Sequence, residues 1–224
     1  MTLTIERPWV TFDLGREMQV LSWAINRPGL VRARRILWRE VRNADLPPDL
    51  DVVDWLDQEL SQRQAQDAVC FLTSRNVQAV TQAQVQIGSV CAYAVATVGL
   101  SNAERVGTRF TRAPGTWGTI NVAVRLDVGL TQTALLESVS IATQARTAAV
   151  MDLGLELPTG RATGTGTDCI AVAAQTGAQA YAGLHTEIGH ALGQAVYDAV
   201  SQGAREWKSS PGAEAAGLSF SGAG

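Results

Sequence analysis

The chain is poor in the residues that most often perform acid–base chemistry or bind metals. Among its 224 residues it has two histidines, His185 and His190, and three cysteines, Cys70, Cys91 and Cys169. The two histidines are five residues apart on one expected helix, which places them about 140° from one another around its axis. Because they do not face one metal ion together, we expect no metal site in the protein and no resident cofactor.

The chain also lacks a disulfide pattern and a long apolar run. An odd number of cysteines, each within or beside an apolar segment, favours buried reduced thiols over a disulfide framework. Nowhere do about eighteen uncharged apolar residues follow one another, and the first residues, Met-Thr-Leu-Thr-Ile-Glu-Arg-Pro, are not typical of a secretory signal. We therefore expect a soluble cytoplasmic protein without a membrane partner.

Lysine is nearly absent, since Lys208 is the only one, and the net charge is −3. A protein that binds nucleic acid needs a surplus of basic residues on one face, so we expect no nucleic-acid partner. Residues 32–42 contain five arginines, interleaved with apolar residues such as Leu37 and Trp38. In an acidic chain we interpret this stretch as a solvated face of the protein.

What the chain does have is the composition of one globular domain, with 46% hydrophobic and 17% charged residues. We expect this domain to cover residues 1–208. Residues 209–224 are rich in serine, glycine and alanine and predict a disordered tail.

Periodicity predicts the elements of that domain. Alternating or continuous apolar patterns predict extended structure at residues 2–26, 68–74, 82–87, 91–98 and 119–127. Three- and four-residue spacing predicts a short helix from Asp49 or Asp51 to Gln62 and long helices at residues 131–153 and 186–206. The fold class is therefore α/β or α+β, a layered mixed β-sheet packed against about three main helices. The segment at 91–98 is apolar on both faces, so it belongs centrally in the sheet.

A glycine loop, residues 162–168, reads Ala-Thr-Gly-Thr-Gly-Thr-Asp. It follows a helix and precedes a strand, whereas a dinucleotide-binding loop follows a strand and precedes a helix, and no Gly-Lys-Ser/Thr motif accompanies it. The order argues against a phosphate site. Turn formation explains the glycines, but Asp168 comes directly before an apolar strand, where a carboxylate is costly unless it has partners. We consider both a structural turn and a site role for Asp168.

The second candidate is His185, which lies at or just before the start of the last helix. A helix N-terminus favours a neutral imidazole, and a neutral imidazole can act as a general base. The alternative is a capping histidine on a surface turn.

Small polar residues follow or begin several of the predicted strands. They are Asn26, Ser74, Asn102 and Asn121. If those strands are neighbours in the sheet, these side chains form a polar rim over an apolar pocket.

Taken together, six segments resemble the adenosylcobinamide amidohydrolases of cobamide salvage. They are Val-Leu-Ser-Trp-Ala-Ile-Asn (20–26), Val-Gly-Leu-Ser-Asn-Ala (98–103), Gly-Thr-Ile-Asn (118–121), the helix that ends at Gly154, the glycine loop, and Tyr-Ala-Gly-Leu-His-Thr-Glu-Ile-Gly (181–189). The resemblance covers most of residues 18–205. The family pattern usually has lysine where Arg146 stands and often an acidic residue where His190 stands.

The resemblance implies hydrolysis of the amide that joins the corrin propionyl side chain to aminopropanol, which yields adenosylcobyric acid; some family members also act on adenosylpseudocobalamin. From the chemistry of amide hydrolysis, our hypothesis makes His185 the base or proton donor and Asp168 its orienting or water-activating partner. The glycine loop would stabilise the oxyanion through Thr163, Gly164, Thr165, Gly166 and Thr167. Asn121, Asn102, Ser74 and Asn26 would bind corrin amides.

Two other classes of function stay open. A corrinoid carrier or sensor would keep the pocket without hydrolysis. A dimeric structural protein is suggested by Gly189 and Gly193, which form a close-packing face on the last helix, although packing within the chain also explains them. The oligomeric state is a monomer or a homodimer. Enzymes that bind cobamide through histidine carry Asp-x-His-x-x-Gly, and Ile188 occupies the aspartate position here, so cobalt is expected only as part of the corrinoid substrate.

Overall fold

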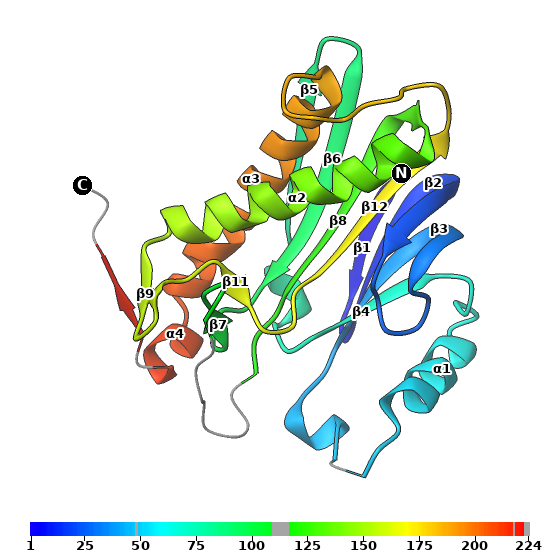
Figure 1. The fold of residues 1–224 in the computed structure, drawn as a ribbon. Coiled ribbons are helices and arrows are strands. Elements are labelled where there is room, and N and C mark those ends of the chain that lie inside the picture. Colours follow the sequence, from blue (N-terminus) through cyan, green and yellow to red (C-terminus); the bar gives the residue numbers. More distant parts are fainter. Residues whose placement is uncertain (48, 109–116, 217, 222–224) are drawn as a thin grey trace.

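The computed structural model describes residues 1–47, 49–108, 117–216 and 218–221. It is an α/β fold with one mixed sheet and three long helices, as the sequence predicts (Figure 1). The strands of the sheet are β1 (Thr2–Glu6), β2 (Trp9–Ser22), β3 (Gly29–Glu40), β4 (Val69–Thr73), β5 (Thr81–Ile87), β6 (Val90–Val98), β8 (Ile120–Leu130) and β12 (Cys169–Thr176). The helices are α1 (Val52–Gln62), α2 (Gln132–Asp152), α3 (Glu187–Lys208) and the short α4 (Pro211–Ala215), with single 3-10 turns at Asn43–Asp45 and Val77–Ala79.

The sheet has the order β4-β3-β2-β12-β8-β6-β5, with β1 paired to β2. The parallel pairing of β8 and β12 aligns Asn121 with Cys169, and the antiparallel pairing of β12 with β2 aligns Ala171 with Ser22. The first residues of β8 and β12 and the last residue of β2 therefore meet at one end of the sheet. Strand β6 lies between β8 and β5, which agrees with an apolar pattern on both of its faces.

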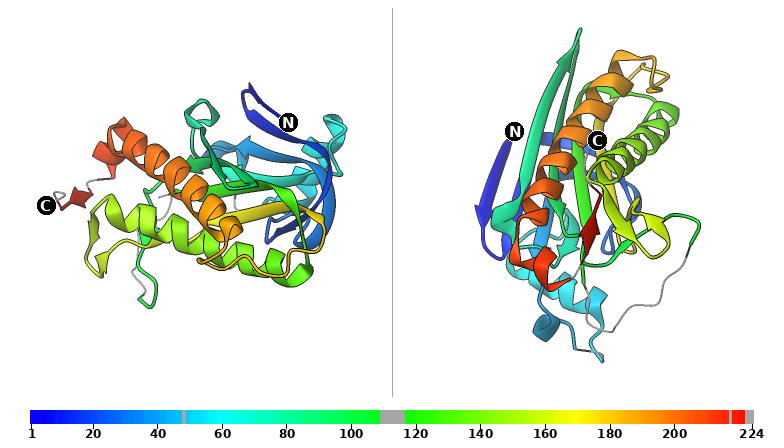
Figure 2. Two further views of the ribbon diagram at one scale, coloured as in Figure 1. Left: turned by 90° about the horizontal axis from the view of Figure 1, so that it is seen from above. Right: turned by 90° about the vertical axis from the view of Figure 1, so that its left-hand side faces the viewer.

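The sheet is strongly curved, so that its first strands fold back over its own face (Figure 2). The pairing of β2 with β3 shifts register between Asp13 and Met18, and such an irregularity bends a strand. Phe12, Trp38 and Phe71 from the folded-back strands share one buried cluster with Ala123 and Ala171 from β8 and β12. The other face of the sheet packs against α2 and α3 (Figure 1). Helix α1 contacts the outer side of the folded-back strands.

Short strands of two or three residues lie outside the main sheet, near its lower end in Figure 1. Strand β7 (Ala103–Glu104) pairs with β11 (Gly164–Thr165), and β9 (Leu155–Leu157) pairs with β10 (Gly160–Arg161). The first of these pairs holds the glycine loop, because β11 lies within it.

The last long helix uses its small residues within the chain. A Cβ atom at Gly189 would overlap the carbonyl oxygens of Gly183 and Ala182, and a Cβ atom at Gly193 would touch Ile141 of α2 at 3.5 Å. This close-packing face therefore contacts the preceding loop and α2, which removes the reason for assigning it to a dimer interface.

The segment after residue 208 differs from the disordered tail that its composition predicts. Residues 211–215 form α4, and β13 (Ser219–Phe220) pairs with β9. The backbone N–H of Ser221 donates to Gly154 O at 2.8 Å, and Leu218 and Phe220 pack against the main core. These long-range contacts have no local sequence pattern, which is why composition alone misses them. Residues 217 and 222–224 lie outside the described residues.

The three cysteines are free thiols, of which Cys70 and Cys169 are buried and Cys91 is half-buried. Within the described ranges, no helix combines the length and apolarity needed to cross a membrane.

Candidate active site at the ends of four strands

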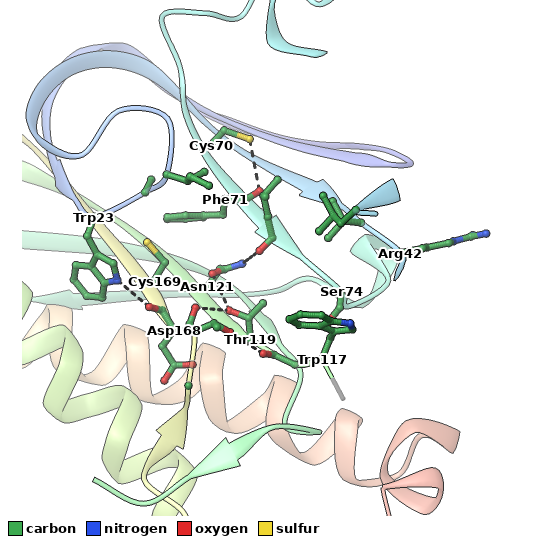
Figure 3. A pocket seen from close by; sticks show the side chains of 18 residues that line it. Trp23, Arg42, Cys70, Phe71, Ser74, Trp117, Thr119, Asn121, Asp168 and Cys169 are labelled. Atoms are coloured by element: carbon green, nitrogen blue, oxygen red, sulfur yellow. Dashed lines mark hydrogen bonds between the residues drawn. The ribbon is translucent and has the colours of Figure 1, made fainter. Parts of the chain in front are cut away.

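A cavity of about 500 Å³ lies where β2 and β4 end and β8 and β12 begin (Figure 3). We refer to it as the strand-end pocket. Its apolar wall consists of Trp23, Ala24, Ile25, Val41, Leu46, Cys70, Phe71, Leu72, Trp117, Gly118 and Cys169. Its polar lining consists of Arg42, Ser74, Thr119, Asn121, Gly166, Thr167 and Asp168. An apolar cavity of this size with a few convergent polar groups is typical of a small-molecule site.

Asn121 connects two of the strands that meet at the pocket. Its side chain is 1% exposed, and its Nδ2 donates to Leu72 O at 2.7 Å, which ties β8 to the end of β4. The Oγ1 of Thr119 donates to Thr167 O at 2.9 Å and lies 3.3 Å from Asn121 Oδ1. Since a primary amide has two N–H donors, one N–H of Asn121 has no acceptor among the described residues. Asn121 is also among the residues that line the pocket.

Asp168 forms the junction between the glycine loop and β12. Its Oδ1 accepts the N–H of Ile120 at 3.0 Å and the hydroxyl of Thr165, and its Oδ2 accepts the N–H of Thr165 at 2.9 Å and a guanidinium N–H of Arg146. These four donors occupy the lone-pair sites of the carboxylate. Figure 3 shows the carboxylate directed away from Asn121 and Phe71. Asp168 therefore has the partners that its position before a buried strand requires.

Arg146 of α2 is the charged partner of Asp168. The two side chains are 13% and 7% exposed, and Arg146 Nη1 also donates to Thr163 O at 3.1 Å. Gly164 lies against this pair, and a Cβ atom there would overlap Arg146 Nη1. The glycine at 164 is therefore explained by the close approach of the ion pair to the loop backbone.

Two exposed tryptophans line the strand-end pocket. Trp23 follows β2 and is 48% exposed, and Trp117 precedes β8 and is 58% exposed. The Nε1 of Trp23 donates to the backbone oxygen of Asp168 at 2.8 Å, which fixes the indole against the end of the glycine loop.

Two thiols, those of Cys169 and Cys70, lie in the pocket wall. The thiol of Cys169 lies 3.7 Å from the hydroxyl of Ser22. Burial, with a smaller contribution from the negative charge of Asp168, raises the pKa of the Cys169 thiol to about 11. Burial also raises the pKa of the Cys70 thiol well above its usual range. Both groups are therefore protonated at neutral pH and are poor nucleophiles.

The polar rim that the sequence predicts is present in part. Ser74, Asn121, Gly166, Thr167 and Asp168 line the pocket together. Thr163, Gly164 and Thr165 lie behind it, in the layer formed by β7 and β11.

The other two predicted rim residues are not among the residues that line the pocket. Asn26 ties the start of β4 in place, since it donates to Ala68 O at 2.9 Å and accepts the N–H of Cys70 at 3.0 Å. Asn102 is buried behind Gly118, where its Oδ1 has no hydrogen-bond partner among the described residues.

His185 does not join Asp168, which corrects the hypothesis of a catalytic pair. Asp168 precedes β12 and His185 follows it, and this strand is eight residues long. At about 3.3 Å per residue the strand separates its two ends by about 25 Å. The chain after β12 is held at this far end of the strands, where the turn between β5 and β6 also lies. In that turn the backbone N–H of Ser89 donates a hydrogen bond to the carboxylate of Glu187, two residues after His185. Thr186, and not His185, caps α3, by accepting the N–H of Gly189 at 2.9 Å.

Sequence reasoning missed the tryptophans and the role of Arg146. Trp23 and Trp117 each stand next to a predicted polar strand end, which is a usable signal. No local pattern links Arg146 to Asp168, because the contact joins a helix to a loop through the fold. In the described parts of the chain, no group of three or more histidine, cysteine or acidic side chains gathers as a metal site would require.

Comparison with known proteins adds three findings. The family model described as adenosylcobinamide amidohydrolase matches residues 1–212. A search of curated proteins gave no match. Among solved structures, the crystal structure of the PH0078 protein from Pyrococcus horikoshii OT3 is similar with a TM-score of 0.46 and 11% sequence identity, over 87% of this chain and 76% of that chain.

Proposed function

The chain belongs to the adenosylcobinamide amidohydrolase family, and from this premise we propose that it hydrolyses the aminopropanol amide of adenosylcobinamide to adenosylcobyric acid and free aminopropanol. The observation that carries the proposal is the strand-end pocket, which combines a largely apolar wall with the free N–H of Asn121. Glycine-loop residues 166–168 form part of its lining. All of the residues that line the pocket lie within the matched residues 1–212.

The volume of the pocket indicates how the substrate binds. Cavities of 300 to 1,000 Å³ hold drug-sized ligands, and this one has about 500 Å³. A corrin macrocycle with its peripheral amides is larger than that, whereas a single propionamide arm with its aminopropanol group fits. We therefore propose that the arm enters the pocket while the macrocycle stays at the entrance.

Asn121 is the proposed donor to the scissile carbonyl. Its Nδ2 is held by Leu72 O, so the amide is already ordered and need not reorganise before its second N–H donates to the substrate. A fixed donor of this kind stabilises the negative charge that develops on the carbonyl oxygen during attack. The hydrogen bond from Asn121 Nδ2 to Leu72 O, 2.7 Å long, fixes the orientation of the amide.

Water is the proposed nucleophile. The thiol of Cys169 is protonated at neutral pH, and the described pocket lining contains no imidazole that would deprotonate it. Asp168 is the one carboxylate among those lining residues. It is directed away from the pocket and accepts four hydrogen bonds, so we propose that it orders the end of the glycine loop and does not take a proton. The attacking water passes its proton to the departing nitrogen, and aminopropanol leaves as the free amine.

Release of aminopropanol from adenosylcobinamide tests the function directly. We expect one equivalent of aminopropanol for each adenosylcobyric acid formed, measured by mass spectrometry with the purified protein. Adenosylpseudocobalamin, which extends the same amide with a nucleotide loop, is the second substrate to assay. Binding of either corrinoid without amine release would favour the carrier or sensor and contradict the hydrolase.

A further inference from the structure

Two of the six tryptophans are unusually exposed, and both line the strand-end pocket. Trp9, Trp38 and Trp207 are at most 5% exposed, whereas Trp23 is 48% and Trp117 is 58% exposed. Burying a large aromatic side chain is strongly favourable, so a protein that leaves two of them in water at one cavity has a binding surface there.

The two indoles lie on opposite sides of the polar centre of the pocket. Figure 3 shows Trp23 at one side and Trp117 at the other, with Asn121, Thr119 and Asp168 between them. Ile25, which is 42% exposed, adds apolar surface beside Trp23. A ligand whose arm reaches Asn121 therefore passes between two aromatic surfaces.

Trp23 also has a fixed orientation. Its Nε1 donates to Asp168 O at 2.8 Å, and Asp168 is in turn held by Arg146 and by two backbone N–H groups. An exposed side chain normally loses conformational entropy when a ligand immobilises it. Because the hydrogen bond already orders this indole, the side chain loses less conformational entropy when a ligand contacts it.

We propose that Trp23 and Trp117 bind the edge of the corrin macrocycle from two sides and thereby select which of its amide arms enters the pocket. This inference rests on the proposed function, since it names how that same site recognises its substrate. Trp23 is in addition a positioning residue, because its N–H links the bound macrocycle to the end of the glycine loop. Corrin carries several similar amides, so contacts with the macrocycle are needed to choose one arm.

The first test measures binding apart from turnover. The probe is adenosylcobyric acid, the corrinoid product, titrated by calorimetry. We expect Trp23→Ala and Trp117→Ala each to raise its Kd about tenfold or more, as loss of a buried aromatic surface predicts. Trp55→Ala is the control, because Trp55 packs against Arg39 outside the pocket and its loss should leave Kd within about twofold. Thermal melts verify that each variant is folded.

The second test separates binding from positioning. Trp23→Phe keeps an aromatic ring but removes the N–H that reaches Asp168 O. We expect KM for adenosylcobinamide to stay near the wild-type value while kcat falls, whereas Trp23→Ala raises KM as well. A purely structural role of Trp23 would lower the melting temperature without this split between KM and kcat.

The outcomes are distinguishable from those of the proposed function. Unchanged Kd in both alanine variants would overturn the tryptophan proposal even if the wild-type protein releases aminopropanol. Weakened corrinoid binding in those variants, with no aminopropanol released by the wild type, would support the tryptophan proposal and contradict the hydrolase. If the wild type does not bind the corrinoid, both are wrong.

Discussion

The two ends of β12 differ. Before its first residue lies the glycine loop, in which the carboxylate of Asp168 is buried and accepts four hydrogen bonds. Beyond its last residue the chain carries His185 on an exposed turn. The Asp168 end adjoins a cavity of about 500 Å³. The His185 end is fixed by backbone and capping contacts, such as the hydrogen bond from Ala182 N to Glu137 at 2.6 Å. A site needs a concave surface and ordered polar groups, and the Asp168 end has both.

Residues that are near one another in the sequence can be kept apart by the strand between them. Asp168 and His185 are the most conspicuous polar groups on either side of one apolar segment. That segment, being a strand, extends by about 3.3 Å per residue, so it holds its two ends apart. Four experiments test this difference between the two ends of β12.

The largest effect is expected from the ion pair behind the pocket. Arg146→Leu leaves the buried carboxylate of Asp168 without its cation, and breaking such a pair costs about 3–5 kcal/mol. We expect a loss of unfolding free energy of that size and at least a hundredfold loss of kcat/KM, whereas Arg146→Lys keeps a cation and should recover part of both. Denaturant unfolding and aminopropanol release measure the two effects.

The exposed pair between Arg161 and Glu156 is the matched control for that experiment. These side chains are 43% and 38% exposed. Arg161→Leu should therefore change the unfolding free energy by less than about 1 kcal/mol. If Arg146→Leu behaved like this control, the ion pair would not hold the site.

Asn121→Ala should give the next largest effect. It removes the proposed oxyanion donor, and loss of one such donor lowers kcat by about a hundredfold. Asn26→Ala is the comparison, because Asn26 also bridges strands but lies outside the pocket lining. We expect that variant to lose about 1–2 kcal/mol of stability with kcat nearly unchanged. Equal kcat values for the two variants would remove Asn121 from the mechanism.

The smallest effect is expected at the other end of β12. His185→Ala should keep kcat/KM within about twofold of the wild type, because His185 is exposed and lies beyond the end of β12 that is opposite to Asp168. Steady-state assays over a range of pH would detect any loss of a titrating group. A drop of a hundredfold would restore His185 to the catalytic site and refute its placement outside it.

Local patterns predicted the elements well. The helix at 131–153 is observed as Gln132–Asp152 with Thr131 as its cap, and the strand at 119–127 is observed as Ile120–Leu130. These succeed because an apolar face of a helix or strand has a fixed period. The arginine pattern of residues 32–42 indicates only a solvated face. Most of that stretch belongs to strand β3, on which Arg32 and Arg34 are exposed.

The candidate site was predictable only in part. The cost of burying Asp168 indicated that it must have partners, and it has them. Their identity depends on α2 crossing the start of β12, which no periodicity encodes. The strand order and the fold-back of β2 to β4 are likewise long-range, and these bring Ser74 and Asn121 into one pocket while Asn26 and Asn102 remain outside its lining.

The location of the site is tested most directly by hydrogen–deuterium exchange with and without adenosylcobyric acid. We expect the corrinoid to slow exchange in peptides that cover residues 20–26, 117–121 and 162–169, which form the strand-end pocket. Peptides that cover residues 177–190, at the His185 end, should exchange at unchanged rates. Protection confined to residues 177–190 would contradict the assignment of the site to the Asp168 end of β12.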